Sequence, residues 1–315
     1  MQTNGLHHVT AVADDPQETV DFYTEVLGLR LVKRTVNFDD TSTYHLYFGD
    51  ETGTPGTAMT FFPFENARRG RPGKGQPTAT AFAIPPGSVD YWVDRLDSYG
   101  VDANVTEDRF GETVLPLRDG DGQPLELVAT ESATETAVEP WSGGPVPAEH
   151  AIRGFHSVTL HSLDTDVTGS VLETLGYERS ETGPDRVRYR VEGNHATVVD
   201  LLTRDGSQGV PGAGTVHHVA FRVPDDDAQA ELAEQLQAAG QSVTPQKDRH
   251  YFRSVYFREP GGILMELATD GPGFTADEPV ETLGSELRVP PWLDDEYERL
   301  AAGLTPLTDP TTGDR

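Results

Sequence analysis

The stretch Leu6-His7-His8-Val9-Thr10-Ala11-Val12 decides the architecture of this chain, because three later segments resemble it. Each segment alternates side chains in the way expected of a strand with one buried face. The segments begin 62 to 76 residues apart, and such a repeat predicts a structure built from copies of one supersecondary unit. The three later segments are Thr78–Ile84, Gly154–Leu160 and Val216–Val223.

The same kinds of element follow each opening strand. A turn marked by Asp, Pro or Ser leads into a stretch with helical spacing of apolar residues, and a glycine ends it. These helical stretches are residues 17–31, 89–100, 166–176 and 228–240, ended by Gly28, Gly100, Gly176 and Gly240. Each unit then runs through further strand-like segments to an apolar closing strand, at residues 57–64, 124–130, 196–202 and 263–269. The pattern predicts an α+β fold made of four βαβββ modules.

A single βαβββ module is too small to fold alone, so we expect the four modules to pair into two half-open barrels. Residues 131–151 are rich in Pro, Gly and Glu, which indicates a linker. This linker separates an N-terminal pair of modules (1–130) from a C-terminal pair (152–270), and a tail follows (271–315). Spacing alone leaves two pairings open: either neighbouring modules form each barrel, or the first module joins the fourth.

Composition narrows the class of function. The 315 residues contain 52 Asp and Glu against 24 Lys and Arg, for a formal charge of −28. A polyanion of this kind makes a poor nucleic-acid binder, because phosphate contacts need clustered cations. Only Lys33, Lys74 and Lys247 are lysines, and this excess of carboxylates predicts a protein adapted to high salt, where self-repulsion is screened.

Several further classes are excluded or disfavoured. The chain has no cysteine, which rules out disulfides, thiolate metal sites and cysteine nucleophiles. No apolar run approaches the roughly 18 residues of a transmembrane helix, and the start MQTNGLHHVT does not resemble a secretory signal. We therefore expect a soluble, cytoplasmic protein that binds no membrane, and we also expect a homo-oligomer.

Histidines and two glutamates point to a metal site. In a strand only one member of each His-His pair can face the barrel interior. Glu126 and Glu266 interrupt apolar closing strands, where a carboxylate is costly unless it binds a cation or a partner. Two imidazoles and one carboxylate form the facial triad typical of non-haem Fe(II) oxygenases. The histidines of the opening strands are His7, His8, His156, His217 and His218.

The spacing of the motifs does not determine the third ligand of the triad. His218 and Glu266 lie in the fourth module, and the third ligand depends on which module shares its barrel. If neighbouring modules pair, that ligand is His156; if the first module pairs with the fourth, it is His8. Alone, each histidine in a strand is more often a hydrogen-bonded core residue than a ligand.

Several motifs resemble one known family. LHHVT, TFFPFENARRGRPGKGQ, IRGFHSVTL, GTVHHVAFRV and DRHYFRSVYFREPGGILMEL resemble the vicinal-oxygen-chelate (glyoxalase/extradiol dioxygenase) superfamily. They are most similar to its ring-cleaving dioxygenases, which include hydroquinone 1,2-dioxygenases and methylhydroquinone-resistance dioxygenases. The resemblance covers residues 5–305, including the tail motif PGFTADEPVETLGSELRVPPWL. It implies a glyoxalase/bleomycin-resistance/dioxygenase fold and cleavage of a hydroquinone- or catechol-type aromatic with O2, using Fe(II) as cofactor, with Mn(II) as the alternative.

The resemblance also assigns residues. It pairs the first module with the fourth and so implies His8, His218 and Glu266 as metal ligands. Thr60 then stands where a glyoxalase places a fourth ligand, and a threonine there favours an open iron site. The positions that match the family's residues around the metal are His7, Thr10, His217, Arg249 and Tyr256. Simple alternation points His7 and His217 away from the metal, so we expect a local twist or bulge at each.

The other barrel and the basic loop carry weaker signals. Glu126, His156 and Asp200 would share the second cavity, where we expect buried polar residues tied to arginine or to backbone groups. Residues 67–75 form the only cationic cluster, and we expect them at a cavity rim or a subunit contact. They lack the spacing of a phosphate-binding loop. The rival functions are a metal-dependent glyoxalase-like lyase or isomerase, which Thr60 disfavours, and a non-catalytic binding protein, which the retained triad disfavours.

Overall fold

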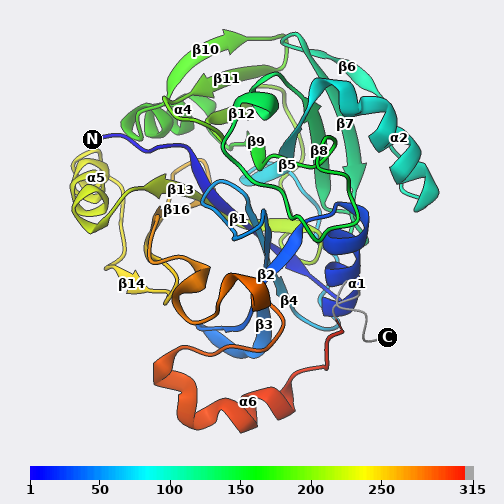
Figure 1. The fold of residues 1–315 in the computed structure, drawn as a ribbon. Helices are drawn as coiled ribbons and strands as arrows, with labels where there is room; N and C mark the ends of the chain where they lie inside the picture. Colours follow the sequence, from blue (N-terminus) through cyan, green and yellow to red (C-terminus); the bar gives the residue numbers. More distant parts are fainter. Residues whose placement is uncertain (309–315) are drawn as a thin grey trace.

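A computed structural model describes residues 1–308, apart from the side chains of 106–108. Its strands form two curved, eight-stranded sheets (Figure 1). Across the first sheet the order is β14 (Lys247–Asp248), β15 (Arg253–Arg258), β16 (Leu264–Thr269), β13 (Thr215–Val223), β1 (Leu6–Ala13), β4 (Ala58–Pro63), β3 (Asp40–Gly49) and β2 (Arg30–Asn37). Across the second it is β10 (Glu178–Thr182), β11 (Arg186–Arg190), β12 (Val198–Leu202), β9 (Phe155–His161), β5 (Gln76–Ile84), β8 (Pro124–Ala129), β7 (Glu112–Arg118) and β6 (Thr106–Arg109).

The order of strands shows which modules share a barrel. β1 pairs antiparallel with β13, so the first sheet joins module one (β1–β4) to module four (β13–β16). β5 pairs antiparallel with β9, so the second sheet joins modules two and three. The two halves of the chain on either side of residues 131–151 therefore do not each form a barrel. The predicted α+β fold of four paired βαβββ modules is confirmed.

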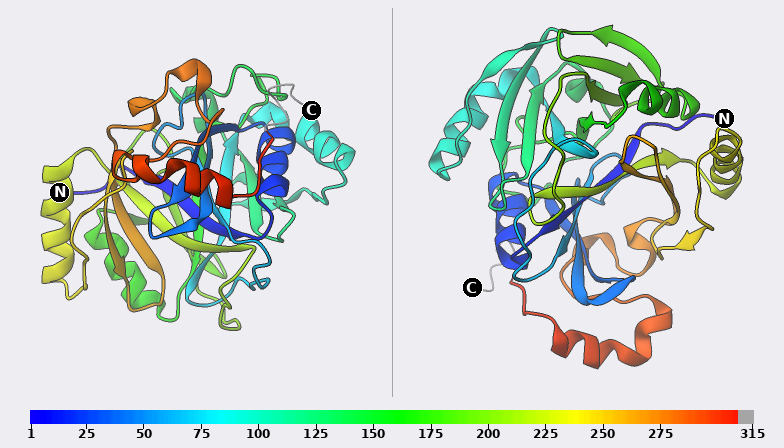
Figure 2. Two further views of the ribbon diagram at one scale, coloured as in Figure 1. Left: turned by 90° about the horizontal axis from the view of Figure 1, so that it is seen from below. Right: turned by 180° about the vertical axis from the view of Figure 1, so that it is seen from behind.

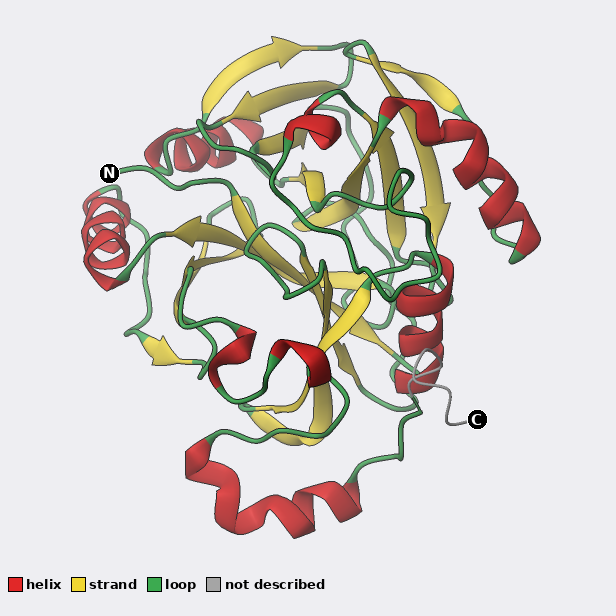
Figure 3. Ribbon diagram, viewed as in Figure 1, coloured by secondary structure: helices red, strands yellow, loops and turns green. Residues whose placement is uncertain are grey.

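A helical segment follows each of the four opening strands, a short helix follows β8, and these helices lie at the periphery of the sheets (Figure 3). Aspartates cap several of them: Asp15 accepts from the backbone N–H groups of Gln17 and Glu18, and Asp225 from that of Ala228. Gly240 ends the last module's helix at a φ of 89°, a conformation that favours glycine. The helices are α1 (Pro16–Asp21) with the π-helical turn η1 (Phe22–Val26), η2 (Pro86–Ser88), α2 (Val89–Ser98), α3 (Ser132–Glu135), α4 (Thr165–Thr174) and α5 (Asp226–Ala238).

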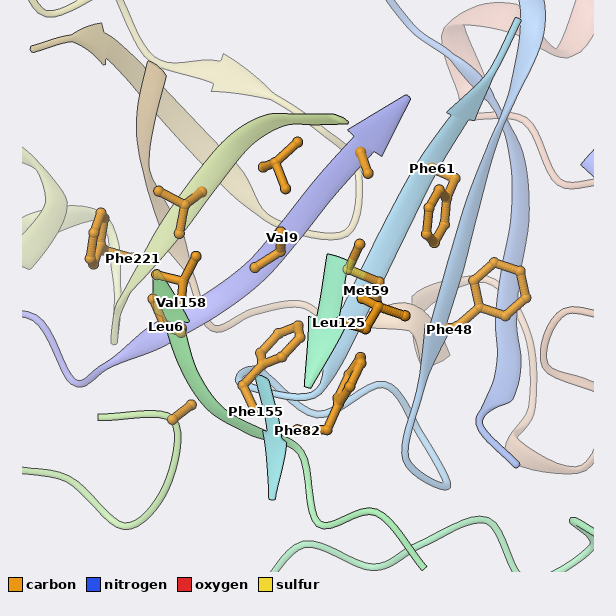
Figure 4. Close-up of a cluster of buried hydrophobic side chains, with 14 of the residues drawn as sticks. Leu6, Val9, Phe48, Met59, Phe61, Phe82, Leu125, Phe155, Val158 and Phe221 are labelled. Carbon is orange, nitrogen blue, oxygen red and sulfur yellow. The ribbon is translucent and has the colours of Figure 1, made fainter. Parts of the chain in front are cut away.

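One hydrophobic core lies between the two sheets. Figure 4 shows Val9 of β1 and Met59 of β4 gathered with Phe82 of β5 and Phe155 of β9. The sheets therefore pack back to back through their apolar faces. Because side chains alternate along a strand, the other faces are left for polar residues. His8, next to Val9, lies on such a face.

The tail covers one side of the first barrel. It runs as the orange and red segment in the views of Figure 2, through η3 (Phe274–Ala276), η4 (Val280–Thr282), η5 (Pro291–Glu296) and α6 (Tyr297–Gly303). Lys33 of β2 is fully buried and forms ion pairs with Glu278 and, at 2.6 Å, with Asp277. The backbone N–H of Arg288 donates to the carbonyl of Arg34 at 2.8 Å. These contacts fix the tail against β2.

Asp119, at the turn between β7 and β8, predicts a pH effect on stability. Burial raises the pKa of this carboxyl to about 6. The hydrogen bonds that it accepts from Gln123 N–H at 2.8 Å and Tyr23 OH at 3.0 Å lower the pKa, but burial outweighs them. A raised folded-state pKa gives stability that is present below the unfolded pKa near 4 and lost as the pH rises through about 6. Asp119→Asn removes this loss. The free energy of unfolding of the variant, relative to that of wild type, should therefore rise by about 1–3 kcal/mol between pH 5 and pH 8.

Urea unfolding at the two pH values measures this difference. Asp90→Asn, which changes an exposed carboxylate on α2, serves as the control and should reproduce the wild-type pH dependence. A free-energy difference between Asp119→Asn and wild type that does not change with pH would contradict the assignment.

Candidate metal centre in the first barrel

Three side chains from adjacent strands meet on the concave face of the first sheet. His8 comes from β1, His218 from β13 and Glu266 from β16, and each is at most 4% exposed. The Nε2 atoms of the two histidines are 3.2 Å apart. Oε2 of Glu266 lies 3.0 Å from His218 Nε2 and 3.4 Å from His8 Nε2. The structure thus brings together the triad that the resemblance implied.

The geometry fits a divalent metal ion. Oε2 of Glu266 is buried and has no hydrogen-bond partner among the described residues, whereas its Oε1 accepts from Ser254 Oγ. Ligand atoms bound to one ion at about 2.1 Å, with angles between 90° and tetrahedral, lie roughly 3.0–3.4 Å apart. The three measured separations fall in this range. The three side chains can therefore hold a metal ion.

His7 and His217 reach the site because each occupies a β-bulge. The register between β1 and β13 shifts once between Leu6 and His8 and again where His218 and Val216 face consecutive residues of β1. An extra residue at a bulge changes the direction of its side chain. Nδ1 of His7 thus lies 2.9 Å from Nδ1 of His8, and Nδ1 of His217 lies 2.8 Å from Nδ1 of His218. The expectation of a bulge at these positions is confirmed.

A backbone carbonyl orients the first of these pairs. His7 Nε2 lies 3.1 Å from the carbonyl oxygen of Thr269, which can only accept, so His7 Nε2 carries the proton. Burial lowers the pKa of His7 to about 3, with a further contribution from His8, so the ring is neutral. Its Nδ1 must then accept from His8 Nδ1–H, which leaves the lone pair of His8 Nε2 facing Glu266. This is the tautomer that a metal ligand needs.

The pKa values of His217 and Glu266 are also shifted by their surroundings. Burial, together with His218, lowers the pKa of His217 to about 4. Burial would raise the pKa of Glu266, but His8 and His218 outweigh it and hold this pKa well below its usual range. A carboxylate oxygen and two imidazole nitrogens form a donor set that suits Fe, Mn or Zn.

A cavity of about 290 Å³ opens beside the triad. This volume is near the lower end of the range for small-molecule pockets, which suits one aromatic ring. Its apolar walls come from Phe38, Phe62, Phe64 and Phe252. Phe252 also lies 5.0 Å from the His8 ring, centroid to centroid. The cavity therefore offers an aromatic enclosure next to the candidate metal position.

Arg249 and Tyr256 lie in the cavity wall, as the resemblance implied. Arg249 Nε donates to Tyr256 OH at 3.1 Å. The Tyr256 ring meets the His218 ring edge-on, with centroids 5.8 Å apart. Burial, followed by the charge of Glu266, raises the pKa of Tyr256, so its phenol is protonated at neutral pH.

Comparison with known proteins agrees with this geometry. The model of the Glyoxalase/Bleomycin resistance protein/Dioxygenase superfamily matches residues 5–127 and 171–267. The chain belongs to this superfamily. It is 45% identical over 306 residues to MhqO of Bacillus subtilis, which is named a ring-cleaving dioxygenase, with 97% of each chain covered. It is 37% identical over 320 residues to the chlorohydroquinone/hydroquinone 1,2-dioxygenase of Sphingobium indicum, covering 98% of this chain and 97% of that one.

Solved structures support the same placement. A crystal structure of a dioxygenase from Bacillus subtilis matches with a TM-score of 0.94 and 44% identity over 98% of each chain. Glyoxalase I from maize matches with a TM-score of 0.60 and 17% identity over 84% of this chain and 92% of that one, which shows the shared fold. The expected family, the ring-cleaving dioxygenases of this superfamily, is confirmed.

Thr10 and Thr60 belong to a hydrogen-bonded chain that includes two residues not foreseen from the sequence. Thr10 Oγ1 lies 2.8 Å from Thr60 Oγ1, which lies 2.9 Å from His45 Nε2. Tyr47 OH lies 2.8 Å from His45 Nδ1. Both rings line the cavity. Alternation along β3, where Leu46 is a core residue, could have placed His45 and Tyr47 on the site face.

Among the side chains that the structure describes, the second barrel has no counterpart of the triad, and its register shows why. Asp200 faces Thr159 and Glu126 faces Ala81, which puts the two carboxylates where the first barrel has Glu266 and Thr60. The positions that match the two ligand histidines hold Ala79 and Ser157. His156 lies where the register between β9 and β5 shifts, so it corresponds to His217. The alternative in which His156 is the third ligand, in the strand position that His8 holds, is therefore wrong.

Arginines occupy the second barrel instead. Arg188 Nε donates to Asp200 at 2.8 Å, and Arg109 donates to both oxygens of Glu126, at 2.5 and 2.7 Å. His156 Nε2 lies 2.9 Å from Glu112. The expectation that Glu126 and Asp200 are tied to arginine is confirmed.

The basic loop forms isolated bridges with residues 208–213. Within residues 67–75, Arg71 N–H donates to the carbonyl of Val210 at 2.8 Å, and Lys74 pairs with Asp205 at 2.5 Å. Pro72 and Gly73 line a cavity of the second barrel, whereas no residue of the loop lines the cavity beside the triad. The loop is thus at a cavity rim, but not that of the candidate site.

Among residues 1–308 there is no helix with the length and apolar character needed to cross a membrane.

Proposed function

We propose that this chain is an Fe(II)-dependent, extradiol-type dioxygenase that cleaves a hydroquinone- or catechol-type aromatic with O2. His8, His218 and Glu266 would hold the metal, and Mn(II) would suit the same donors. The observation that carries the proposal is the buried Oε2 of Glu266, which has no hydrogen-bond partner among the described residues and faces two imidazole nitrogens at the edge of an aromatic cavity. The names of the relatives, which include a hydroquinone 1,2-dioxygenase, support the choice of substrate.

A ferrous ion bound there would supply electron transfer between a bound aromatic ring and O2. The protein's own contribution begins with orientation. His7 and His217 bond the outer nitrogens of the ligand histidines at 2.9 and 2.8 Å, which holds the two imidazoles in one tautomer. The phenylalanine walls of the cavity would position the ring and exclude water.

Two residues can give protons or hydrogen bonds to the reacting oxygens. Tyr256 accepts from Arg249 Nε, so its own hydroxyl proton is available to the cavity. His217 lines the cavity, and with its Nδ1 accepting from His218 its Nε2 carries a proton. Donors fixed in this way stabilise negative charge as it develops on oxygen. We assign Thr10 a supporting role, because its hydroxyl is tied to Thr60 and through it to His45.

Oxygen uptake tests the proposal. The protein is purified without oxygen, its bound metal is analysed, and it is reconstituted with Fe(II) or Mn(II) in molar KCl. We expect stoichiometric iron and O2 consumption matched to loss of the ring on at least one of a panel of 1,2- and 1,4-dihydroxybenzenes. Nickel or zinc without O2 uptake would indicate a glyoxalase-like lyase, and the absence of any bound metal would indicate a binding protein.

A further inference from the structure

Three charged side chains stand together at the cavity beside the triad. Asp39 belongs to the turn between β2 and β3 of module one, whereas Lys247 and Arg249 belong to module four. Asp39 Oδ2 accepts from Arg249 Nη2 at 2.6 Å, and Lys247 Nζ lies 3.3 Å from Asp39 Oδ1. A single carboxylate therefore pairs with both the lysine and the arginine side chain in the described lining of this cavity.

The positions of these groups define an inner and an outer side. The side chain of Arg249 is 15% exposed and that of Asp39 is 58% exposed. Arg249 reaches inward to Tyr256 OH at 3.1 Å and outward to Asp39. Asp39 thus covers the guanidinium on its more exposed side, where a molecule in the cavity could come close to its negative charge.

The turn that carries Asp39 is held in place from both sides. Its backbone N–H donates to Asn37 Oδ1 at 3.0 Å. The neighbouring Phe38 ring contacts Trp292 of the tail, with centroids 5.7 Å apart. On the opposite side, Lys247 lies in β14, which pairs with β15. The position of the Asp39 carboxylate is therefore fixed by its neighbours.

We propose that Asp39 is a specificity determinant that makes this cavity take uncharged dihydroxybenzenes and reject rings bearing a carboxylate. The proposal rests on the function proposed above and names its substrate class. A carboxylated ring would find both cations already paired with Asp39 and would meet this like charge at the cavity. Repulsion between two like charges about 4 Å apart is substantial at the effective dielectric of a protein surface. Discrimination by a repulsive group is a common route to specificity.

Asp39→Asn separates this role from a purely structural one. The asparagine keeps an oxygen that can accept from Arg249 Nη2, so the shape of the contact is preserved while the charge is lost. Asp40→Asn is the matched control: it removes the same charge from the next residue, whose carboxylate accepts from Ser42 and does not line the cavity. Asp39→Glu keeps the charge and tests rescue.

The probes are 2,5-dihydroxybenzoate and its methyl ester, which differ mainly in charge. For Fe(II)-loaded wild type and variants, kcat and KM are measured by oxygen uptake, and dissociation constants are measured calorimetrically without oxygen. We expect wild type to prefer the ester and Asp39→Asn to reduce this preference by about tenfold or more, through KM and the dissociation constant. Asp40→Asn and Asp39→Glu should keep the wild-type preference.

Each outcome decides a different point. An unchanged ester-to-acid ratio in Asp39→Asn, or an equal change in Asp40→Asn, overturns the role of Asp39. Failure of the ester to bind metal-loaded wild type overturns it as well. If wild type binds the ester but consumes no O2 with any dihydroxybenzene, the proposed function fails, while the anaerobic titration still tests Asp39.

Discussion

His8→Ala should lose bound iron and ring-cleaving activity, whereas His156→Ala should keep both. His8 Nε2 faces His218 Nε2 at 3.2 Å and Glu266 Oε2 at 3.4 Å, and alanine leaves two protein ligands where three converge. We expect activity to fall by at least about 1000-fold, because ligand number sets both metal retention and reactivity. Metal content and oxygen uptake, measured on the same preparations, give the result.

His156→Ala is the matched control from the corresponding strand of the other barrel. Its Nε2 pairs with Glu112 at 2.9 Å, and Arg188 holds the other oxygen of Glu112 at 2.6 Å. Loss of one partner of this carboxylate should cost about 1–3 kcal/mol of stability without affecting the metal. His218→Ala and Glu266→Ala should behave like His8→Ala. Wild-type iron content in His8→Ala, or iron loss in His156→Ala, would show that the triad is assigned wrongly.

The stability of the whole protein should depend steeply on salt. The formal charge is −28, and the few lysines are already engaged: Lys33 with Asp277 and Glu278, Lys74 with Asp205, and Lys247 with Asp39. At low ionic strength the remaining carboxylates repel one another over longer distances. Dilution from molar KCl to about 0.01 M, where the screening length is about 30 Å, should lower the melting temperature strongly or unfold the chain.

Thermal unfolding across a KCl series measures this effect. A neutral osmolyte such as sucrose, which does not screen charge, provides the control and should not restore stability at low salt. A melting temperature that is the same at low and molar KCl would rule out adaptation to high salt. Equal stabilisation by sucrose would attribute the effect to exclusion of solute from the surface and not to screening.

Many of the strands and helix ends can be predicted from short stretches of the sequence. Period-two alternation placed the four opening strands, and glycines such as Gly28 and Gly240 placed the ends of helices, because a positive φ is a local requirement. His218 and Glu266 could be singled out because a carboxylate within an apolar strand needs a partner nearby. The family could be inferred as well, because the order of several motifs is specific even where each single motif is common.

The tertiary structure alone decided which strands lie side by side. Both pairings of modules bury the same apolar faces, so local pattern cannot choose between β1 beside β13 and β1 beside β5. The observed pairing of β1 with β13 brings His8 to His218, although 210 residues separate them. The register shifts that turn His7 and His217 toward the ligands arise from that pairing, as does the approach of Asp39 to Arg249. Such contacts depend on long-range packing between strand edges, which no short stretch of sequence encodes.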